Sequence, residues 1–310
     1  MSSEPAPSDS PRGHNPTAPR SPAATRIVGR VMALEVLDKP ALALAGLIRG
    51  ALGSGTVKDL LSGTQIGHAL HPVLSDVPVG SWTSASLLDL MGGPDADTAA
   101  ERLVAVGILA ALPTAVSGFS DWADTTVDDK EVTRVGVAHA VSNVVALALY
   151  TASWAQRRGG RRAPARVLGL MGLSALGAGG FLGGHLAFNS AVAVDRTTFE
   201  DLPAEWTDAA GTDDLAEGAS AVAQVGGVPV LLVRRGGEVL AISDHCTHRG
   251  GPLHEGPIDG DCVTCPWHAS VFSLRDGAVL SGPASAPQPA LDTRIREGRI
   301  EVRAAVAIPG

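Results

Sequence analysis

Two short stretches near the C-terminal end each combine a cysteine with a histidine. The first is Cys246-Thr247-His248 and the second is Cys265-Pro266-Trp267-His268, with sixteen residues between His248 and Cys265. The chain has three cysteines, all between residues 246 and 265, which is too few and too clustered for a disulfide scaffold. Thiolate sulfur and imidazole nitrogen are ligands for soft and borderline metals. The pattern therefore predicts a metal centre.

Two kinds of centre compete for this ligand set. In a Rieske [2Fe–2S] centre, two cysteines hold one iron and two histidines hold the other. A structural zinc ion also accepts cysteine and histidine. Zinc fingers, however, usually pair cysteine with cysteine and histidine with histidine, whereas each stretch here mixes the two. The mixed pairs favour an iron–sulfur centre, whose chemistry is one-electron transfer rather than substrate turnover.

The sequence CTHRGGPL … CPWHASVF resembles the Rieske [2Fe–2S] domain family, over roughly residues 206–304. The resemblance implies an all-β (ISP-like) domain of small antiparallel sheets, with both ligand loops at one tip. It also implies that Cys246 and Cys265 bind one iron and that His248 and His268 bind the other. Ser270 matches a family serine that can donate a hydrogen bond to a bridging sulfide.

Departures from the family pattern indicate which class of Rieske protein this is. The quinol-oxidising class has two further cysteines in a disulfide, and the matching positions here are Gly251 and Trp267. Phe272 replaces a tyrosine whose hydroxyl donates to a ligand sulfur. Fewer donors to sulfur stabilise the reduced cluster less, which lowers its potential. We therefore expect a low-potential, ferredoxin-like centre.

The sequence also allows predictions for four other residues near the motif and for the class of enzyme. Ala269 stands where the family usually has glycine, a departure that could strain the loop. Cys262 is expected to be a packed thiol, and His245 and His254 to be surface residues. No triad of two histidines and a carboxylate for mononuclear iron follows the motif, so the chain is not expected to be an oxygenase.

Short β-runs surround the two ligand stretches. The segments GVPVLLV and EVLAIS flank residues 234–237 (RRGG), a hairpin signal. We expect the Rieske domain to span residues 216–304 and a polar, acidic linker to span residues 196–215.

The preceding half is apolar and predicts a membrane domain. Residues 103–120, 135–156 and 167–194 are nearly free of charge and reach the roughly 18–20 residues needed to cross a bilayer. Residues 72–90 are a weaker segment because they contain Asp76 and Asp89. We predict an all-α four-helix transmembrane bundle over residues 67–195, and buried helices of a soluble protein are the alternative. The stretches LHPVLSDVPVG and SGFSDWAD resemble a membrane family of unknown function, DUF2231, which implies no known chemistry.

The N-terminal residues predict less structure. Residues 1–29 are rich in proline and serine and are expected to be a disordered tail. Residues 30–66 predict amphipathic helices, either on or beside the membrane, or a soluble connecting pair. A net charge of −8 argues against a nucleic-acid partner.

Three histidines of the membrane half could form a second site. In an up-down-up-down bundle, His71, His139 and His185 lie at the face from which the Rieske domain emerges. Ionisable groups inside a membrane often mark functional sites. One hypothesis is that they hold a b-type haem, a quinone or a metal ion. The alternative is that they cap helix ends and hydrogen-bond one another and Asp76.

Charge distribution predicts the orientation of the chain in the membrane. The loop after the third apolar segment carries five arginines (157, 158, 161, 162 and 166), whereas residues 121–134 hold five acids. Counting positive charges puts the arginine loop in the cytoplasm and the Rieske domain outside, in a multi-pass protein of a bacterial cell membrane.

The expected protein is a membrane-anchored Rieske electron carrier, a component of an oxidoreductase system rather than a stand-alone enzyme. Its expected partners are the lipid bilayer and a redox protein, which could be a reductase, an oxygenase or a membrane oxidoreductase. We expect electrons to pass through an exposed histidine edge at His248 and His268. The alternatives are a subunit of a quinone- or haem-linked oxidoreductase and a non-catalytic redox sensor.

Overall fold

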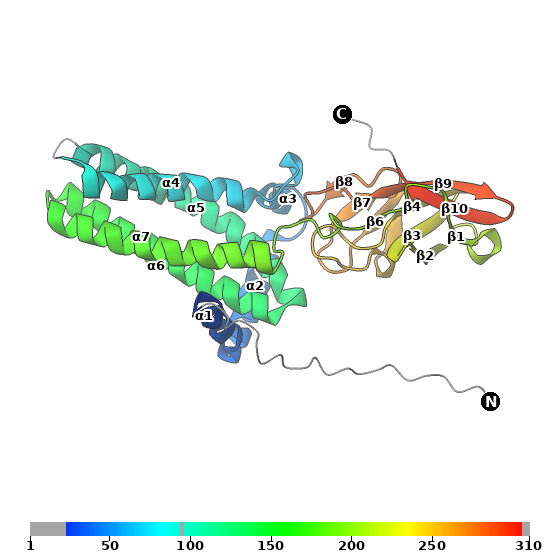
Figure 1. Ribbon diagram of the computed structural model, residues 1–310, viewed down its shortest axis with the longest axis horizontal. Helices are drawn as coiled ribbons and strands as arrows, with labels where there is room; N and C mark the ends of the chain where they lie inside the picture. Colours follow the sequence, from blue (N-terminus) through cyan, green and yellow to red (C-terminus); the bar gives the residue numbers. More distant parts are fainter. Residues whose placement is uncertain (1–22, 94–95, 306–310) are drawn as a thin grey trace, which may run out of the picture.

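The structure is a computed structural model that describes residues 23–93 and 96–305. A helical domain and a β domain lie end to end, so that the molecule is elongated (Figure 1). The expected multidomain layout, helices followed by an all-β domain, is confirmed.

The helical domain is built on four long helices, α4 (Leu70–Met91), α5 (Ala96–Asp128), α6 (Lys130–Arg158) and α7 (Arg162–Gly184). A π-helical turn, His185–Asn189, continues α7. Among the described residues, α5, α6 and α7 with its π-turn are long and apolar enough to cross a membrane. Helix α4 does not reach that hydropathy, in line with the two aspartates noted in its sequence.

Small residues let these helices pack closely around an aromatic pair. The rings of Trp82 (α4) and Tyr150 (α6) stack with their centroids 4.5 Å apart. A Cβ atom at Gly172 would lie 2.9 Å from the Tyr150 ring, so α7 approaches α6 only because this residue is glycine. The glycine-rich sequence of α7 is therefore a packing feature.

The end of the bundle away from the β domain is held by ion pairs. Arg157 (α6) and Asp89 (α4) form a buried pair. Asp97 (α5) binds Arg162 and Arg166, both at 2.9 Å. The arginine-rich loop is therefore largely paired with carboxylates from α4 and α5.

The N-terminal helices pack against the side of the bundle. They are α1 (Ala23–Met32), a 3-10 turn (Glu35–Leu37), α2 (Asp38–Leu52), α3 (Thr56–Ser62) and a second 3-10 turn (Thr64–Ile66). Residues 23–29, expected as part of a disordered tail, instead begin α1, because Val28 is buried against Val135 and Leu182. The remainder of that tail, residues 1–22, lies outside the described residues.

The β domain contains two antiparallel sheets. The six-stranded sheet has the order β1-β10-β9-β4-β3-β2 and the four-stranded sheet has the order β5-β6-β7-β8. The strands are β1 (Thr207–Gly211), β2 (Ser220–Val225), β3 (Val228–Arg235), β4 (Glu238–Ser243), β5 (Ile258–Asp259), β6 (Cys262–Thr264), β7 (Val271–Ser273), β8 (Val279–Ser281), β9 (Ala290–Arg296) and β10 (Arg299–Ala304). Strands β3 and β4 form the hairpin that the RRGG turn predicts, with positive φ at Gly236 and Gly237.

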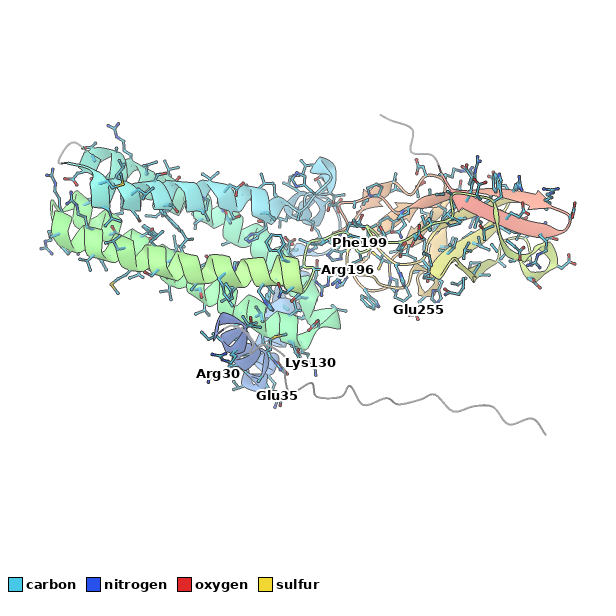
Figure 2. All side chains as sticks on the ribbon, in the orientation of Figure 1. Arg30, Glu35, Lys130, Arg196, Phe199 and Glu255 are labelled. Atoms are coloured by element: carbon cyan, nitrogen blue, oxygen red, sulfur yellow. The ribbon has the colours of Figure 1, made fainter. Side chains whose placement is uncertain are left out.

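The β domain starts earlier in the chain than expected. Residues 207–211, expected within a linker, form β1 and pair with β10 at the sheet edge. The guanidinium carbons of Arg294 and Arg303 lie over the Trp206 ring, 4.4 and 4.5 Å from its centroid. The connecting segment is therefore shorter, and Figure 2 shows Arg196 and Phe199 on it, between the two domains.

Candidate metal centre

Two loops of the β domain bring the cysteine–histidine stretches together. The first loop follows β4 and the second joins β6 to β7. Cys246 and Cys265 are buried, and their sulfur atoms are hydrogen-bonded to each other. The rings of His248 and His268 lie 4.8 Å apart, nearly perpendicular. The four side chains predicted as ligands therefore form two close pairs, one of cysteines and one of histidines, on the same two loops.

The protonation states at this place suit metal ligands. The Cys246 thiol and the backbone N–H groups of Trp267 and His268 lower the pKa of Cys265 to about 7. The hydrogen bond to Cys265 and burial raise the pKa of Cys246, so the pair tends to share one proton. Burial and the nearby His268 lower the pKa of His248 well below its usual value, which keeps this imidazole neutral.

His248 also has an unused ligand atom. Its Nδ1 is buried and has no hydrogen-bond partner among the described residues. Buried polar nitrogens are rarely left without a partner, because desolvation without a hydrogen bond is costly. A neutral imidazole with a free inner nitrogen, beside two cysteines, fits the ligand set of a [2Fe–2S] cluster.

Tight backbone turns hold the two loops. The N–H of Gly250 donates to Cys246 O at 2.7 Å, and the N–H of Ala269 donates to Cys265 O at 3.0 Å. Ala269 has a φ of 59°, the left-handed region that favours glycine. The strain expected from alanine at this position is therefore present in the loop.

Gln288, which sequence reasoning missed, ties a third loop to the first. Its side-chain amide donates to Ser243 O at 2.8 Å and to His245 O at 2.6 Å, and its carbonyl accepts from Thr247 N at 3.2 Å. The side chain is almost fully buried. Only the burial of a glutamine marks this role, and burial is not visible in the sequence.

The positions that distinguish Rieske classes lie around the centre. A Cβ atom at Gly251 would lie 3.0 Å from the Trp267 ring and 3.0 Å from Cys265 Sγ, so the indole occupies the space where a disulfide would run. Phe272 is fully buried in the same core as both cysteines. Ser270 is buried and accepts the N–H of Ala284 at 3.0 Å, which leaves its own proton free to donate. Cys262 is a partly buried free thiol in β6.

The two flanking histidines are paired with acids away from the centre. His245 Nδ1 lies 2.8 Å from Glu200 and His254 Nδ1 lies 2.6 Å from Asp244. Both side chains are nearly half exposed. This placement agrees with the expectation that they are surface residues.

The outer edge of the two predicted ligand histidines is not open to solvent, contrary to expectation. His268 Nε2 lies 3.0 Å from the backbone oxygen of Asp124, and His248 Nε2 lies 3.6 Å from its carboxylate. The His248 side chain is only 14% exposed. The reason is that the C-terminal end of α5 packs against the tip of the β domain.

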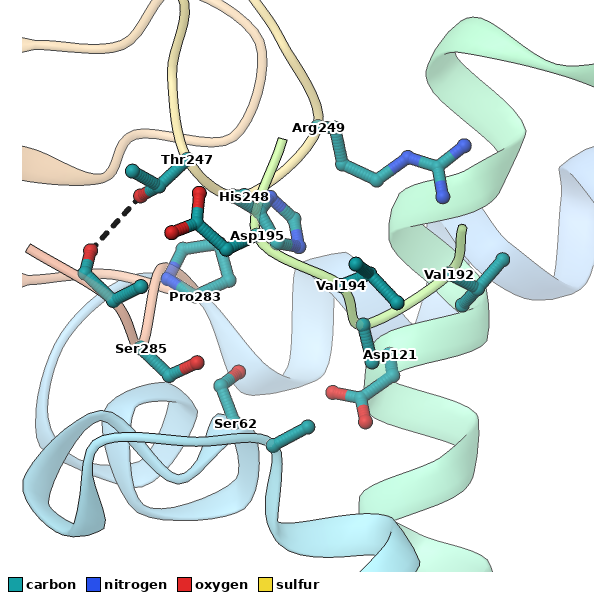
Figure 3. A pocket seen from close by; sticks show the side chains of 13 residues that line it. Ser62, Asp121, Val192, Val194, Asp195, Thr247, His248, Arg249, Pro283 and Ser285 are labelled. Atoms are coloured by element: carbon teal, nitrogen blue, oxygen red, sulfur yellow. Dashed lines mark hydrogen bonds between the residues drawn. The ribbon is translucent and has the colours of Figure 1, made fainter. Parts of the chain in front are cut away.

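Two cavities lie at this junction. The smaller, about 40 Å³, is lined by His248 from one domain and Asp121 from the other (Figure 3). It has room for a few ordered water molecules and nothing larger. The other, about 400 Å³ and partly open, lies between the second ligand loop, with Trp267 and His268, and residues 48–58.

The structure brings together two of the three membrane histidines. The His71 and His139 rings lie 6.2 Å apart and nearly perpendicular. Each Nδ1 is hydrogen-bonded to a carbonyl of another helix, Thr114 O at 2.9 Å and Gly179 O at 2.8 Å. His185 begins the π-helical turn, and no ring contact joins it to His71 or His139 in the described part of the chain.

Comparisons with known proteins agree with this geometry. Residues 205–295 match the Rieske [2Fe-2S] domain, and residues 67–196 match a predicted membrane protein family, DUF2231. The anthranilate 1,2-dioxygenase ferredoxin subunit of Burkholderia cepacia is 33% identical over 99 residues, 32% of this chain and 92% of the ferredoxin. The cytochrome b6-f complex iron-sulfur subunit of Chlorobaculum tepidum is 32% identical over 89 residues, 29% of this chain and 48% of that protein.

Among solved structures, the ferredoxin of carbazole 1,9a-dioxygenase from Nocardioides aromaticivorans is 30% identical. The match covers 32% of this chain and 98% of the ferredoxin, with a TM-score of 0.31. Fold and site together define an iron–sulfur electron-transfer domain. The chain belongs to the Rieske [2Fe–2S] domain family, and a DUF2231 domain precedes the Rieske domain. Both resemblances seen in the sequence are confirmed.

Proposed function

We propose that this protein is a membrane-anchored, low-potential electron carrier whose cluster is held by Cys246, Cys265, His248 and His268. The observation that supports the proposal is the pairing of the two cysteines and of the two histidines on two neighbouring loops, with the inner nitrogen of His248 buried and without a hydrogen-bond partner among the described residues. When bound, a [2Fe–2S] cluster supplies reversible uptake of one electron. The protein's own groups hold it, shield it from water and donate N–H hydrogen bonds to the cysteine sulfurs.

The low potential follows from the residues that surround the sulfur atoms. Phe272 offers no hydroxyl to a ligand sulfur, and the Gly251–Trp267 contact takes the place of a bracing disulfide. Each missing donor leaves the more negative, reduced cluster less stabilised. The partner is proposed to be a redox protein of the reductase, oxygenase or membrane oxidoreductase kind.

The test is paired EPR and optical spectroscopy on detergent-purified protein, oxidised and dithionite-reduced, with a redox titration. A Rieske-type signal at low potential is expected. Because a ligand imidazole can lose its second proton, the midpoint potential should fall at alkaline pH. Zinc in place of an iron–sulfur signal would overturn the proposal.

A second function, a two-centre electron carrier, is favoured by the paired histidines of the bundle. The carbonyl groups that bind Nδ1 of His71 and His139 can only accept, so each ring carries its proton on Nδ1 and keeps Nε2 as its basic nitrogen. Basic imidazole nitrogens are ligands of b-type haem, and these two rings have centroids 6.2 Å apart; a quinone or a metal ion is the alternative occupant. Haem bands that disappear in both His71→Ala and His139→Ala, with His185→Ala as control, would support this function. Purified protein without such bands would remove the haem version.

We also propose that the Rieske domain lies outside the cytoplasm of a bacterial cell. The support is the arginine-rich loop at the opposite end of the bundle. A C-terminal alkaline phosphatase fusion is expected to be active and a C-terminal GFP fusion to be dark. The reverse pattern would place the domain in the cytoplasm.

A further inference from the structure

One residue of the helical domain faces the outer edge of both cluster histidines. The backbone oxygen of Asp124 lies 3.0 Å from His268 Nε2, and its carboxylate lies 3.6 Å from His248 Nε2. A carbonyl oxygen can only accept, so the first contact requires the proton of His268 to sit on Nε2. The opposite nitrogen, Nδ1, then keeps the lone pair that a metal ligand needs.

Asp124 is itself held firmly by a lysine from another helix. Lys58 (α3) donates to the Asp124 carboxylate at 2.8 Å and to Ser120 at both its hydroxyl (2.9 Å) and its carbonyl (3.1 Å). Both side chains of the ion pair are under 10% exposed. A buried ion pair of this kind constrains geometry, because loss of either partner leaves the other charge buried and poorly compensated.

Further contacts hold the β domain at the same place. The N–H of Gly282 donates to the Asp59 carboxylate at 2.7 Å, and the Thr64 hydroxyl donates to Gly282 O at 2.6 Å. The N–H of Arg196 donates to Thr247 O, within the first ligand loop, at 3.0 Å. The junction therefore touches all three loops at the tip of the β domain.

We propose that Asp124 is a positioning residue for the cluster. Its contacts set the tautomer and orientation of the two ligand histidines, and its carboxylate, with Lys58, sets the charge next to them. The first partner of the histidine edge is thus the chain's own helical domain rather than a separate protein. This inference rests on the proposed function, because it assumes that His248 and His268 are the cluster ligands.

The first test is Asp124→Asn in the full-length, cluster-loaded protein. The substitution removes the carboxylate that Lys58 contacts directly and leaves the lysine charge buried, which weakens the junction. Amide hydrogen exchange of residues 281–284, measured by mass spectrometry, should rise about tenfold or more. The midpoint potential should also rise, because an unopposed positive charge near the histidines favours the reduced form.

Two matched variants separate these effects from a general loss of structure. Glu101→Gln removes a carboxylate from the same helix at its far end, where Glu101 pairs with Arg158, and should change neither measurement. Asp124→Glu keeps the charge and should restore the potential towards that of the parent. If Asp124→Asn does not accumulate, Lys58→Met with Asp124→Leu removes both charges. A smaller rise in potential is then expected, because the lost carboxylate is the charge in contact with His248.

The possible outcomes are distinct. A Rieske signal with unchanged exchange and potential in Asp124→Asn, or in the double variant, would overturn the positioning role while leaving the proposed function intact. An equal change in Glu101→Gln would also overturn it. A parent protein without a Rieske signal would instead overturn the proposed function.

Discussion

Phe272 replaces the tyrosine of the Rieske pattern, and it shares a buried core with both cysteines. We expect Phe272→Tyr to raise the midpoint potential, because a new donor stabilises the reduced cluster. An EPR-monitored redox titration measures the shift, with Phe272→Leu as a control that adds no donor. If the hydroxyl reaches no acceptor, the cost is about 1–3 kcal/mol of stability with an unchanged potential, and the prediction is wrong.

Gly282 lies where two loops of the β domain meet. Its φ is +97°, and a Cβ atom there would lie 2.5 Å from Ser270 Cα. We expect Gly282→Ala to destabilise the domain by several kcal/mol, on the order of 3, because strain adds to a backbone clash. Gly236→Ala is the matched control: its φ is also positive, but nothing lies within 4 Å of the added atom, so about 1 kcal/mol is expected. Thermal unfolding measures the stability of both variants. Equal losses of stability would contradict a steric clash at position 282.

Residue types and spacing were sufficient to predict that the two cysteine–histidine stretches lie side by side, because each stretch keeps its cysteine and histidine within three residues. Gln288 and Asp124 could not be predicted. They reach the site across 41 and 144 residues of sequence, respectively. No local pattern encodes such contacts, which depend on how loops and domains pack.

At the level of elements, apolar length predicted the long helices because burial in lipid or in a bundle demands continuous apolar sequence. Strand β1 was not predicted, because its own sequence carries no strand signal. Its sequence TDAAG has no alternation of apolar and polar residues, and as an edge strand it is defined by its pairing with β10.

The edge pairing of β1 should respond to acid. The Arg299 guanidinium holds the pKa of Asp208 below its ordinary value of 3.8. The contribution of this pair is therefore full above about pH 4 and is lost as the pH falls through the lower, folded-state pKa. Thermal unfolding as a function of pH should show a small loss below pH ~4. In Arg299→Met, this acid-dependent loss of stability should be absent. A variant whose stability falls with acid as in the parent would contradict the prediction.

The ion pair between α4 and α6 should contribute more to stability than the exposed ion pairs near it. Arg157→Met leaves the buried Asp89 with the more distant Arg166, at 3.9 Å, as its remaining ion-pair partner among the described residues, and we expect a loss of about 3 kcal/mol. Arg158→Met removes an arginine that is 67% exposed and should cost under about 1 kcal/mol. Thermal unfolding in detergent distinguishes them. The double variant Asp89→Leu/Arg157→Met should recover much of the stability that Arg157→Met alone loses. If it does not, Arg157 has a role other than neutralising Asp89.

At the scale of the whole molecule, the order of the helices along the chain predicted which groups share an end of the bundle. His71 and His139 do meet, and the β domain packs beyond the end of α5. The docking of the two domains could not be predicted, because it depends on short polar contacts such as that between Asp59 and Gly282. The sequence therefore predicted a tethered electron carrier in which the outer edge of His248 and His268 faces solvent. In the structure, the end of α5 covers that edge.

Helix α5 contacts both the candidate metal centre and the proposed histidine-pair site. Thr114 O binds His71, and Asp124, ten residues further on and thus about 15 Å along the helix axis, meets the cluster histidines. A continuous helix moves as a rod, so a ligand that shifts α5 at His71 also shifts Asp124. Thermodynamic linkage makes this relation mutual: if occupancy at the histidine pair changes the free energy of docking, docking changes the affinity at the histidine pair by the same factor. Occupancy of the histidine pair would therefore depend on whether the β domain is docked against α5.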